Sequence, residues 1–438
     1  MTAVIEKAEA QGRAPPARVR TSSLLVAVPA LAWHLFGALL VARLIAFPST
    51  LDEIEHLSFI RWMERAPSLL PHYERMRILA PDLAHWTNTT NYVVHPSPYY
   101  LFIGLFDRLF GGNVLTLRLV DIAISTTAVA LILWAGFRVL SGWRERAAFA
   151  AFLVGFPKLA IVAGMINNDN AAFLAAGVGF ACLLAWQRRA GWREAAFLAF
   201  GLAFCGWTKL TVLLMVGLSA LIAEALRATS GARKASLPGF LIISSGGLVG
   251  AIPTIANFAR YGAPLYESPT FAGPTTHPLV LSLPKYANLF FWQMGVKWSA
   301  FEPSPLIARI GLVIVLLLAS LVVVLTMLRQ GSNSGSLDEA GPWRLAAGSA
   351  LALIPILALH LWFGWSAMRE TGFIDAAQPR YYYGLWPGIS FGLALLLVWR
   401  PKSVVLFALC AGAALILLLS TPGPWLLADL LTHRPVPV

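Results

Sequence analysis

"SLLVAVPALAWHLFGALLVARLIAF", residues 23–47, decides the fold class of this chain. The stretch is longer than the roughly 20 apolar residues that cross a bilayer as a helix. No small-residue cleavage site of a secretory signal follows it, so we expect an uncleaved first transmembrane helix. The whole chain has the same character, with 58% hydrophobic and 12% charged residues and a mean hydropathy of +0.69. Soluble domains contain roughly 25% charged residues, so the composition predicts an all-α, polytopic membrane helix bundle.

Clusters of Lys and Arg separate the apolar stretches and set the expected orientation. They occur in the tail up to Arg20 and at 138–146, 187–193, 227–234, 329–344 and 400–402. Because short cytoplasmic loops carry an excess of Lys and Arg, we place these clusters in the cytoplasm, with the N-terminus inside and the C-terminus in the periplasm. The net charge of +12 then reflects membrane orientation, and we expect no nucleic-acid partner.

The 20-residue criterion divides the chain into about eleven transmembrane helices. The predicted spans are 23–47, 114–138, 147–165, 170–187, 194–207, 210–226, 238–258, 305–328, 345–365, 381–399 and 403–420. Large outer loops remain at 48–113 and 259–304, with short ones at 166–169, 208–209 and 366–380. We expect a cytoplasmic tail over 1–22, a first transmembrane module over 23–226 and a more variable second module over 227–438.

Each large outer loop contains a segment that we expect to lie as a helix in the membrane interface. The first is "YYLFIGLFDRLFGG" at 99–112, with Asp107 and Arg108 on its wet side. A crossing here would turn every later basic cluster outward, which the positive-inside rule disfavours. The second is "KYANLFFWQMGVKW" at 285–298, whose aromatic and basic residues suit that depth.

"LDEIEH", residues 51–56, opens the first outer loop with three acidic residues and a histidine. Thr50 to Glu53 fit a helix capping box, and the helix dipole favours acidic residues in a first turn. Alternatively, Asp52 and His56 lie four residues apart on one helix face, where Asp52 could act as a general base toward a lipid-linked substrate. The two interpretations are compatible, since Glu53 can cap the helix while Asp52 points inward.

Four further polar residues fall in or beside the outer loops. His95 precedes two prolines, and either the extended backbone that proline imposes or a ligand role explains it. Asp169, in "NNDN" at 167–170, is either a helix N-cap or a carboxylate that completes a metal or acceptor site. Lys209 and Arg380 each stand at the start of a span, where either snorkelling to the interface or ligand binding explains them.

The expected topology brings these side chains to one face of the membrane from four separate segments. Charges near lipid are costly unless they are paired, so we expect a shared polar cavity. In such a cavity Lys209 and Arg380 would neutralise a phosphate leaving group while Asp52 removes a proton from an acceptor hydroxyl. The sequence therefore predicts displacement at a sugar carbon, with a phosphate-activated donor.

Four motifs, in their order along the chain, resemble the GT-C superfamily of integral-membrane glycosyltransferases, which includes protein O-mannosyltransferases and lipid A aminoarabinose transferases. The motifs are "LDEIEH" at 51–56, "HPSPYYLFIGLFDRLFGGNVLTLRL" at 95–119, "NNDN" at 167–170 and "GWTK" at 206–209. The resemblance covers roughly residues 23–226. "HPSPYY" departs from the His-Pro-Pro-Leu or Lys-Pro-Pro-Leu of many relatives, which leaves the details of the donor pocket open.

The resemblance implies a role for each acidic residue. Asp52 corresponds to the catalytic carboxylate, and Glu53 to its neighbour beside the acceptor. Asp169 corresponds to the acidic residue of the second outer loop. Some relatives need a divalent cation, for which Asp52 and Asp169 would be the ligands of a Mg²⁺ or Mn²⁺ ion.

The basic residues follow the same resemblance. Lys209 and Arg380 are expected to contact the donor phosphate, and we place His56 and His95 with them in the donor site. Arg118 matches the family's arginine where the second span begins. Asp121 lies one turn later, and we expect it to form a structural pair with Arg118.

These inferences predict an enzyme at the outer face of a bacterial-type inner membrane. Its donor would be a polyprenyl-phosphate-linked sugar, and its acceptor a hydroxyl of an envelope glycan, lipid or protein. The alternative is a multi-pass transporter or lipid flippase, but such proteins bind near the bilayer midplane on discontinuous helices of related halves, whereas here the polar residues gather at one surface. A scaffold subunit is a third hypothesis, which a tight protein partner without donor binding would favour.

Overall fold

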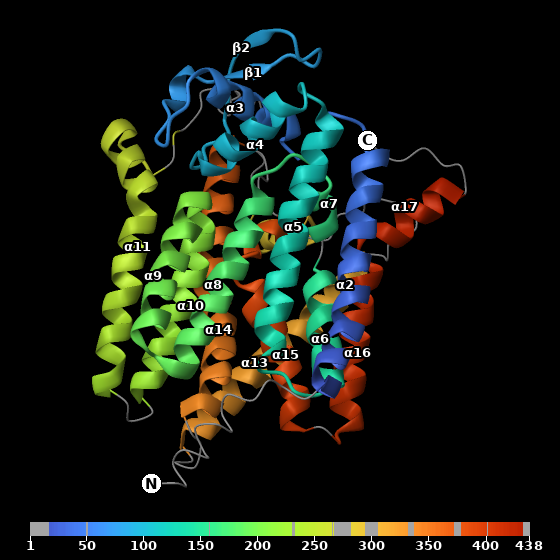
Figure 1. Cartoon of the computed structure of the whole chain (residues 1–438), viewed down its shortest axis with the longest axis vertical. Helices are drawn as coiled ribbons and strands as arrows, with labels where there is room; N and C mark the ends of the chain where they lie inside the picture. Colours follow the sequence, from blue (N-terminus) through green and yellow to red (C-terminus); the bar gives the residue numbers. More distant parts are fainter. Residues whose placement is uncertain are drawn as a thin grey trace.

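The computed structural model is a bundle of long α-helices with a cap of shorter elements at one end (Figure 1). The structure describes residues 17–49, 51–156, 158–229, 233–264, 266, 282–293, 305–331, 337–371, 378–400 and 402–431. The long helices run side by side, and the cap covers the upper end of the bundle in Figure 1. The prediction of an α-helical membrane bundle is confirmed.

The elements follow one another with few long connections. The bundle contains α2 (Ala17–Leu44), α5 (Val114–Phe137), α6 (Trp143–Val154), α7 (Leu159–Ala163), α8 (Asp169–Arg189), α9 (Trp192–Thr208), α10 (Leu210–Thr229), α11 (Arg233–Tyr261), α12 (Leu283–Gln293), α13 (Pro305–Gly331), α14 (Leu337–Thr371), α15 (Trp386–Trp399), α16 (Val404–Leu419) and α17 (Pro422–Leu431). The cap contains α3 (Glu53–Arg65), the 3₁₀ helix η1 (Tyr73–Arg75), the strands β1 (Arg77–Leu79) and β2 (Trp86–Thr90), and α4 (Pro98–Leu109). A second 3₁₀ helix, η3 (Pro379–Tyr382), precedes α15.

Within the described residues, six helical segments are long and apolar enough to cross a membrane. They are Ser23–Leu44, Val114–Phe137, Asp169–Arg189, Leu210–Thr229, Leu237–Tyr261 and Ala340–Arg369. The bent pair α16 and α17, with 49° between its parts, makes a seventh if it is one broken span. The eleven predicted spans are therefore not confirmed.

Three of the unconfirmed spans differ from the prediction in length or continuity within the described residues. With 17 and 14 residues, α9 and α15 are shorter than the roughly 20 residues that cross a bilayer. The predicted span at 147–165 is divided between α6 and α7. Lys158, at the break, has a φ of 65°, which a right-handed helix does not allow.

Small residues and aromatic rings pack the bundle helices closely. A Cβ on Gly206 of α9 would lie 2.1 Å from the carbonyl oxygen of Gly250 in α11, so only glycine permits this approach. Phe149 of α6, Phe180 of α8 and Phe391 of α15 form a cluster with ring centroids 5.6, 5.7 and 6.2 Å apart. Because helices in lipid associate through van der Waals packing, these contacts hold α9 against α11 and hold α6, α8 and α15 together.

The segment predicted as the first outer loop forms the cap, including a β-hairpin that the sequence did not predict. β1 and β2 pair antiparallel, with Arg77 opposite Thr90 and Leu79 opposite Trp86. A two-stranded hairpin is marginally stable alone, so it needs support. Helix α3 provides it, because the backbone N–H of Leu79 donates to the Ser58 hydroxyl at 2.8 Å.

α4 forms within the predicted interfacial segment and exposes the apolar side chains of Phe102, Leu105 and Leu109. The prediction that Asp107 faces water is wrong. Asp107 is buried against α3, where Arg61 Nε lies 3.3 Å from its carboxylate, whereas Arg108 is exposed. In the second outer loop α12 occupies 283–293, and the rest of the predicted interfacial segment, 294–298, lies outside the described residues.

Candidate functional site

Asp52 stands where the connection from α2 turns into α3. Its φ of 60° lies in the left-handed region, an unusual conformation for a residue other than glycine. Although Asp52 occupies the N-cap position, its carboxylate makes no capping bond. Oδ1 accepts a hydrogen bond from the Tyr92 hydroxyl at 2.7 Å, and Oδ2 accepts one from Arg380 Nη2 at 2.9 Å. With 30% of its side chain exposed, Asp52 is accessible, whereas Glu53 and Asp169 are buried.

Arg380 links Asp52 to a buried ion pair. Lys209 Nζ pairs with Asp169 Oδ1, and Arg380 Nη1 lies 3.4 Å from Asp169 Oδ2. The side chains of Asp169, Lys209 and Arg380 are only 2%, 9% and 5% exposed. Charges at this depth are stable only when they are paired, and two cations here balance two carboxylates. The structure thus brings together the four charged residues that the sequence predicted to converge, and we call them the charged cluster.

Each member of the charged cluster lies at a helix end or a break between helices. Asp169 begins α8, where the partial positive charge of the helix N-terminus favours a carboxylate. Lys209 separates α9 from α10 with an extended backbone, φ −159° and ψ 127°, which directs its side chain away from both helices. Arg380 lies in η3 directly after Pro379. Helix packing therefore places four segments that are distant along the chain at one end of the bundle.

Some polar atoms in and around the charged cluster have no hydrogen-bond partner among the described residues. They are Arg380 Nε, Asp169 Oδ2 and the Tyr383 hydroxyl. Since buried polar groups are nearly always hydrogen-bonded, the free N–H of Arg380 is available to a ligand. The ring of Tyr381 lies 5.2 Å from Lys209 Nζ and 5.5 Å from the Arg380 guanidinium carbon, which helps to fix both cations.

His56 and His95 stack beside the charged cluster, with ring centroids 5.9 Å apart. His56 Nδ1 also lies 2.9 Å from the Tyr100 hydroxyl. Burial lowers the pKa of His56 to about 3, and burial is also the main cause that holds the pKa of His95 well below its usual 6.5. Both rings are therefore neutral at pH 7 and can offer hydrogen bonds but no charge.

The low pKa of His56 predicts a loss of stability in acid. Between 6.5 and about 3, the unfolded chain binds a proton at His56 that the folded chain does not, so stability falls as the pH drops through this range. Thermal unfolding midpoints of the purified protein at neutral and mildly acidic pH measure the effect. In His56→Gln this difference of about one bound proton between the folded and unfolded chain is absent. The unfolding midpoint is therefore expected to fall less steeply with decreasing pH than in the unmodified protein.

His85 supplies the matched control, because its side chain is 79% exposed on the hairpin. His85→Gln should leave the pH dependence as it is in the unmodified protein. An unchanged pH dependence in His56→Gln would contradict the assignment of a buried neutral ring.

Glu53 is held in a buried ion pair. Its side chain is fully buried, and its two oxygens accept from Arg118 Nε and Nη2, both at 2.7 Å. The backbone N–H groups of Ser49 and Ile166 donate to the same carboxylate at 3.0 and 3.1 Å. This geometry corrects the expectation that Glu53 caps α3, and the expectation that Glu53 neighbours the acceptor stays a prediction. Thr50 of the predicted capping box lies outside the described residues.

The predicted pair of Arg118 with Asp121 is wrong. Arg118 pairs with Glu53 and also donates to two carbonyl groups at the end of α2. Asp121 instead accepts from the Tyr99 hydroxyl at 2.8 Å and from the backbone N–H of Asn167 at 3.3 Å. The two side chains hold different elements: Arg118 holds the loop after α2, and Asp121 holds α4 and the start of α8.

Asp52 and Asp169 do not fit a divalent metal ion. Mg²⁺ and Mn²⁺ need several oxygen ligands around an accessible centre. Arg380 lies between these two carboxylates and Lys209 pairs with one of them, so a metal ion would meet two positive charges. In the part of the chain that the structure describes, no three His, Cys, Asp or Glu side chains gather where they could hold a metal ion.

Sequence reasoning missed two residues beside Asp52. Tyr92 donates its hydroxyl hydrogen bond to Asp52, and Glu55 lies close enough to Asp52 for the charges of the two carboxylates to interact. Burial raises the pKa of Glu55 above its usual value. The spacing of Glu55 from Asp52, three residues in a helix, could have indicated their proximity. Tyr92 lies in an extended segment without periodicity, so no local signal marks it.

Comparisons with known proteins give a loose likeness to solved structures. Neither a protein-family model nor a curated protein sequence matches the chain. The chain is similar to the crystal structure of ArnT from Cupriavidus metallidurans bound to undecaprenyl phosphate. The similarity covers 92% of this chain and 77% of that one, with a TM-score of 0.42 and 16% identical residues. At this identity and TM-score, no residue role is transferred from that structure to this chain. The chemistry of the site is therefore inferred from the side chains described above.

Proposed function

We propose that this protein transfers a sugar from a polyprenyl-phosphate-linked donor to an acceptor hydroxyl, with Asp52 as the general base. The observation that supports this most is the position of Arg380, which joins the accessible carboxylate of Asp52 to the buried pair of Asp169 and Lys209. A base beside fixed cations is what displacement of a phosphate leaving group requires. The substrate class comes from the motifs that resemble membrane glycosyltransferases.

In the proposed reaction, Asp52 takes the proton of the acceptor hydroxyl. The acceptor oxygen forms a bond to the sugar carbon, and the bond from that carbon to the donor phosphate breaks. The bonding electron pair leaves with the phosphate, whose negative charge increases. The hydrogen bond from Tyr92 holds the Asp52 carboxylate in one orientation during this step.

Lys209 and Arg380 stabilise the leaving phosphate in this proposal. Without donor, Asp169 and Asp52 together neutralise both cations, and Asp169 pairs with each of them. The unpartnered Nε–H of Arg380 gives a phosphate oxygen its first contact. The neutral rings of His56 and His95 add hydrogen-bonding groups without adding charge. The proposed reaction uses no divalent ion, because Lys209 and Arg380 stabilise the negative charge of the leaving phosphate.

The donor lipid and the location complete the proposal. The site lies under the cap at one end of the bundle, where α4 exposes an apolar face that suits contact with membrane lipid (Figure 1). We assign this end to the outer face of a bacterial-type inner membrane. The acceptor is an envelope glycan, another lipid or a protein.

Purified protein incubated with a radiolabelled polyprenyl-phosphate sugar and an envelope extract is expected to release polyprenyl phosphate, also in the presence of EDTA. Lys209→Met should weaken the apparent affinity for the donor by about 10- to 100-fold, because a hydrogen bond to a charged group contributes about 1.5–3 kcal/mol. The measurement is the donor concentration that gives half-maximal release.

Lys285→Met is the matched control, because Lys285 is exposed on α12. Its half-maximal donor concentration should equal that of the unmodified protein. The proposal fails if the unmodified protein releases no polyprenyl phosphate, or if Lys209→Met and Lys285→Met behave alike. Transport of an intact donor across vesicles, without release, would identify a flippase instead.

A further inference from the structure

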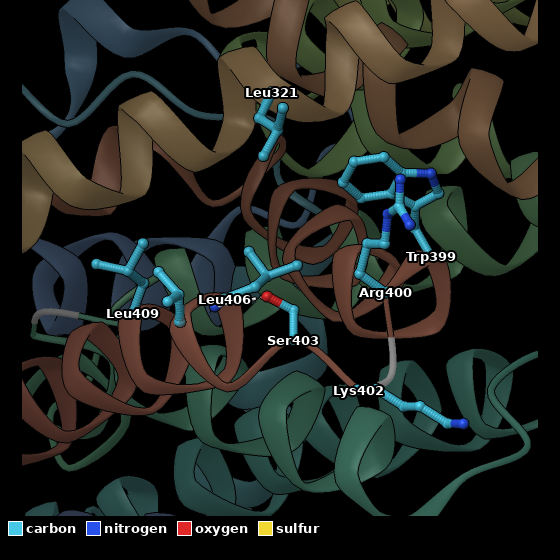
Figure 2. Close-up of a pocket in the computed structure, with 8 residues that line it drawn as sticks. Leu321, Trp399, Arg400, Lys402, Ser403, Leu406 and Leu409 are labelled. Atoms are coloured by element: carbon cyan, nitrogen blue, oxygen red, sulfur yellow. Dashed lines mark hydrogen bonds between the residues drawn. The ribbon is translucent and has the colours of Figure 1, made fainter.

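A cavity of about 690 Å³ lies at the other end of the bundle from the charged cluster. It is lined by Leu321 of α13, Trp399 at the end of α15, and Arg400, Lys402, Ser403, Val405, Leu406 and Leu409 (Figure 2). α15 has 14 residues and begins just beyond Arg380. At about 1.5 Å per residue, the cavity lies roughly 20 Å along the bundle from the charged cluster. The proposed sugar transfer does not use it.

One wall of the cavity is apolar and faces outward. Val405 and Leu409 of α16 are four residues apart and therefore share a helix face, and they are 71% and 44% exposed. Leu321 and Leu406 continue this wall in Figure 2. In a membrane-spanning bundle, such a wall is the kind of surface against which an acyl chain packs.

The rim of the cavity is basic. Arg400 and Lys402 line it, both are exposed, and neither forms an ion pair with a carboxylate in the described part of the chain. The Arg400 guanidinium carbon lies 4.8 Å from the ring centre of Trp399, which holds the cation at the rim. Trp and Arg are side chains that prefer the level of lipid headgroups.

We propose that this cavity binds an anionic phospholipid, with its phosphate at Arg400 and Lys402 and an acyl chain along Leu321, Leu406 and Leu409. Basic pockets between transmembrane helices bind anionic headgroups in this way. The volume falls in the range of about 300–1,000 Å³ that is typical of small-ligand sites. The bound lipid would fill the space between α13, α15 and α16. This site is independent of the proposed sugar transfer.

The test titrates delipidated protein with phosphatidylglycerol or phosphatidylcholine and counts bound lipids by native mass spectrometry. The unmodified protein is expected to bind phosphatidylglycerol more tightly than phosphatidylcholine. The double variant Arg400→Gln with Lys402→Gln should lose about 10- to 30-fold in affinity for phosphatidylglycerol, since each basic residue near a headgroup contributes about 1 kcal/mol. Leu409→Ser should also weaken binding, although it changes no charge.

Arg188→Gln with Arg189→Gln is the matched control. These residues lie at the end of α8, which, like α15, starts near the charged cluster. They therefore lie at the same end of the bundle as the cavity, but they do not line the cavity. An equal loss of affinity in the two double variants would show general attraction to a basic surface and overturn the proposal. Equal retention of the two lipids, or displacement of phosphatidylglycerol by inorganic phosphate at the same concentration, would overturn it as well.

Discussion

Replacing Asp52 with asparagine is expected to slow sugar transfer by about 10²–10⁴-fold, because an amide cannot take the proton of the acceptor hydroxyl. Asparagine keeps the size of the side chain; its oxygen can still accept from Arg380, and its NH2 group can donate to the hydroxyl oxygen of Tyr92. The cations that would hold the donor phosphate also stay in place, since Asp169 pairs with both of them. Donor affinity should therefore change little while the rate of transfer falls.

The measurement combines two assays on the same purified variant. Radiolabelled donor gives the rate of transfer, and binding of unreactive polyprenyl phosphate gives the affinity. Asp82→Asn is the matched control, because Asp82 is 54% exposed on the hairpin and pairs only locally with His85. A transfer rate in Asp52→Asn within a few-fold of the control would show that Asp52 is not the general base.

The second large effect is expected on stability, at Glu53. Glu53→Gln leaves the Arg118 guanidinium buried at 4% exposure without its counter-charge. Removal of one partner from a buried ion pair typically costs about 3–5 kcal/mol, whereas removal of an exposed partner costs about 0–1 kcal/mol. The thermal unfolding midpoint of Glu53→Gln in detergent should fall well below that of Asp82→Asn.

A double variant separates the structural role of Glu53 from a direct catalytic one. Replacing Glu53 and Arg118 together with methionine removes both charges and should recover part of the lost stability. A catalytic Glu53 would behave differently, because Glu53→Gln would then lose transfer activity while its unfolding midpoint stayed unchanged. That result would support the expectation that Glu53 lies beside the acceptor.

The positions of the charged residues could be predicted from the sequence because topology alone determines them. Apolar runs define the spans, and basic clusters define which loops share a face, so Asp52, Asp169, Lys209 and Arg380 were expected at one end of the bundle. Arg380 shows how far this reasoning reaches, since it lies 328 residues from Asp52 in the chain and 2.9 Å from it in the structure.

The partners of individual side chains could not be predicted in the same way. Spacing along a helix favoured Asp121 for Arg118, yet the guanidinium turns to Glu53, 65 residues away. Tertiary packing decides such choices, because the loop after α2 passes directly by α5 and offers carbonyl groups as well as the carboxylate. The hairpin of β1 and β2 was missed for a related reason, since its three- and five-residue strands are held by α3.

The number of spans is not confirmed, in part because hydropathy does not detect breaks within a helix. The run at 147–165 is apolar throughout most of its length, but Lys158 adopts a left-handed conformation and separates α6 from α7. α15 is apolar because it is almost entirely buried in the bundle. A buried helix and a lipid-facing helix give the same hydropathy signal.

An experimental structure of the protein with polyprenyl phosphate tests the central claim most directly, namely that the charged cluster is a phosphate site beside a catalytic base. The account predicts phosphate density within hydrogen-bond distance of Arg380 and Lys209, on the side where Asp52 is exposed. Phosphate density located elsewhere, with the pairs of Arg380 and Lys209 to Asp169 and Asp52 undisturbed, would contradict it.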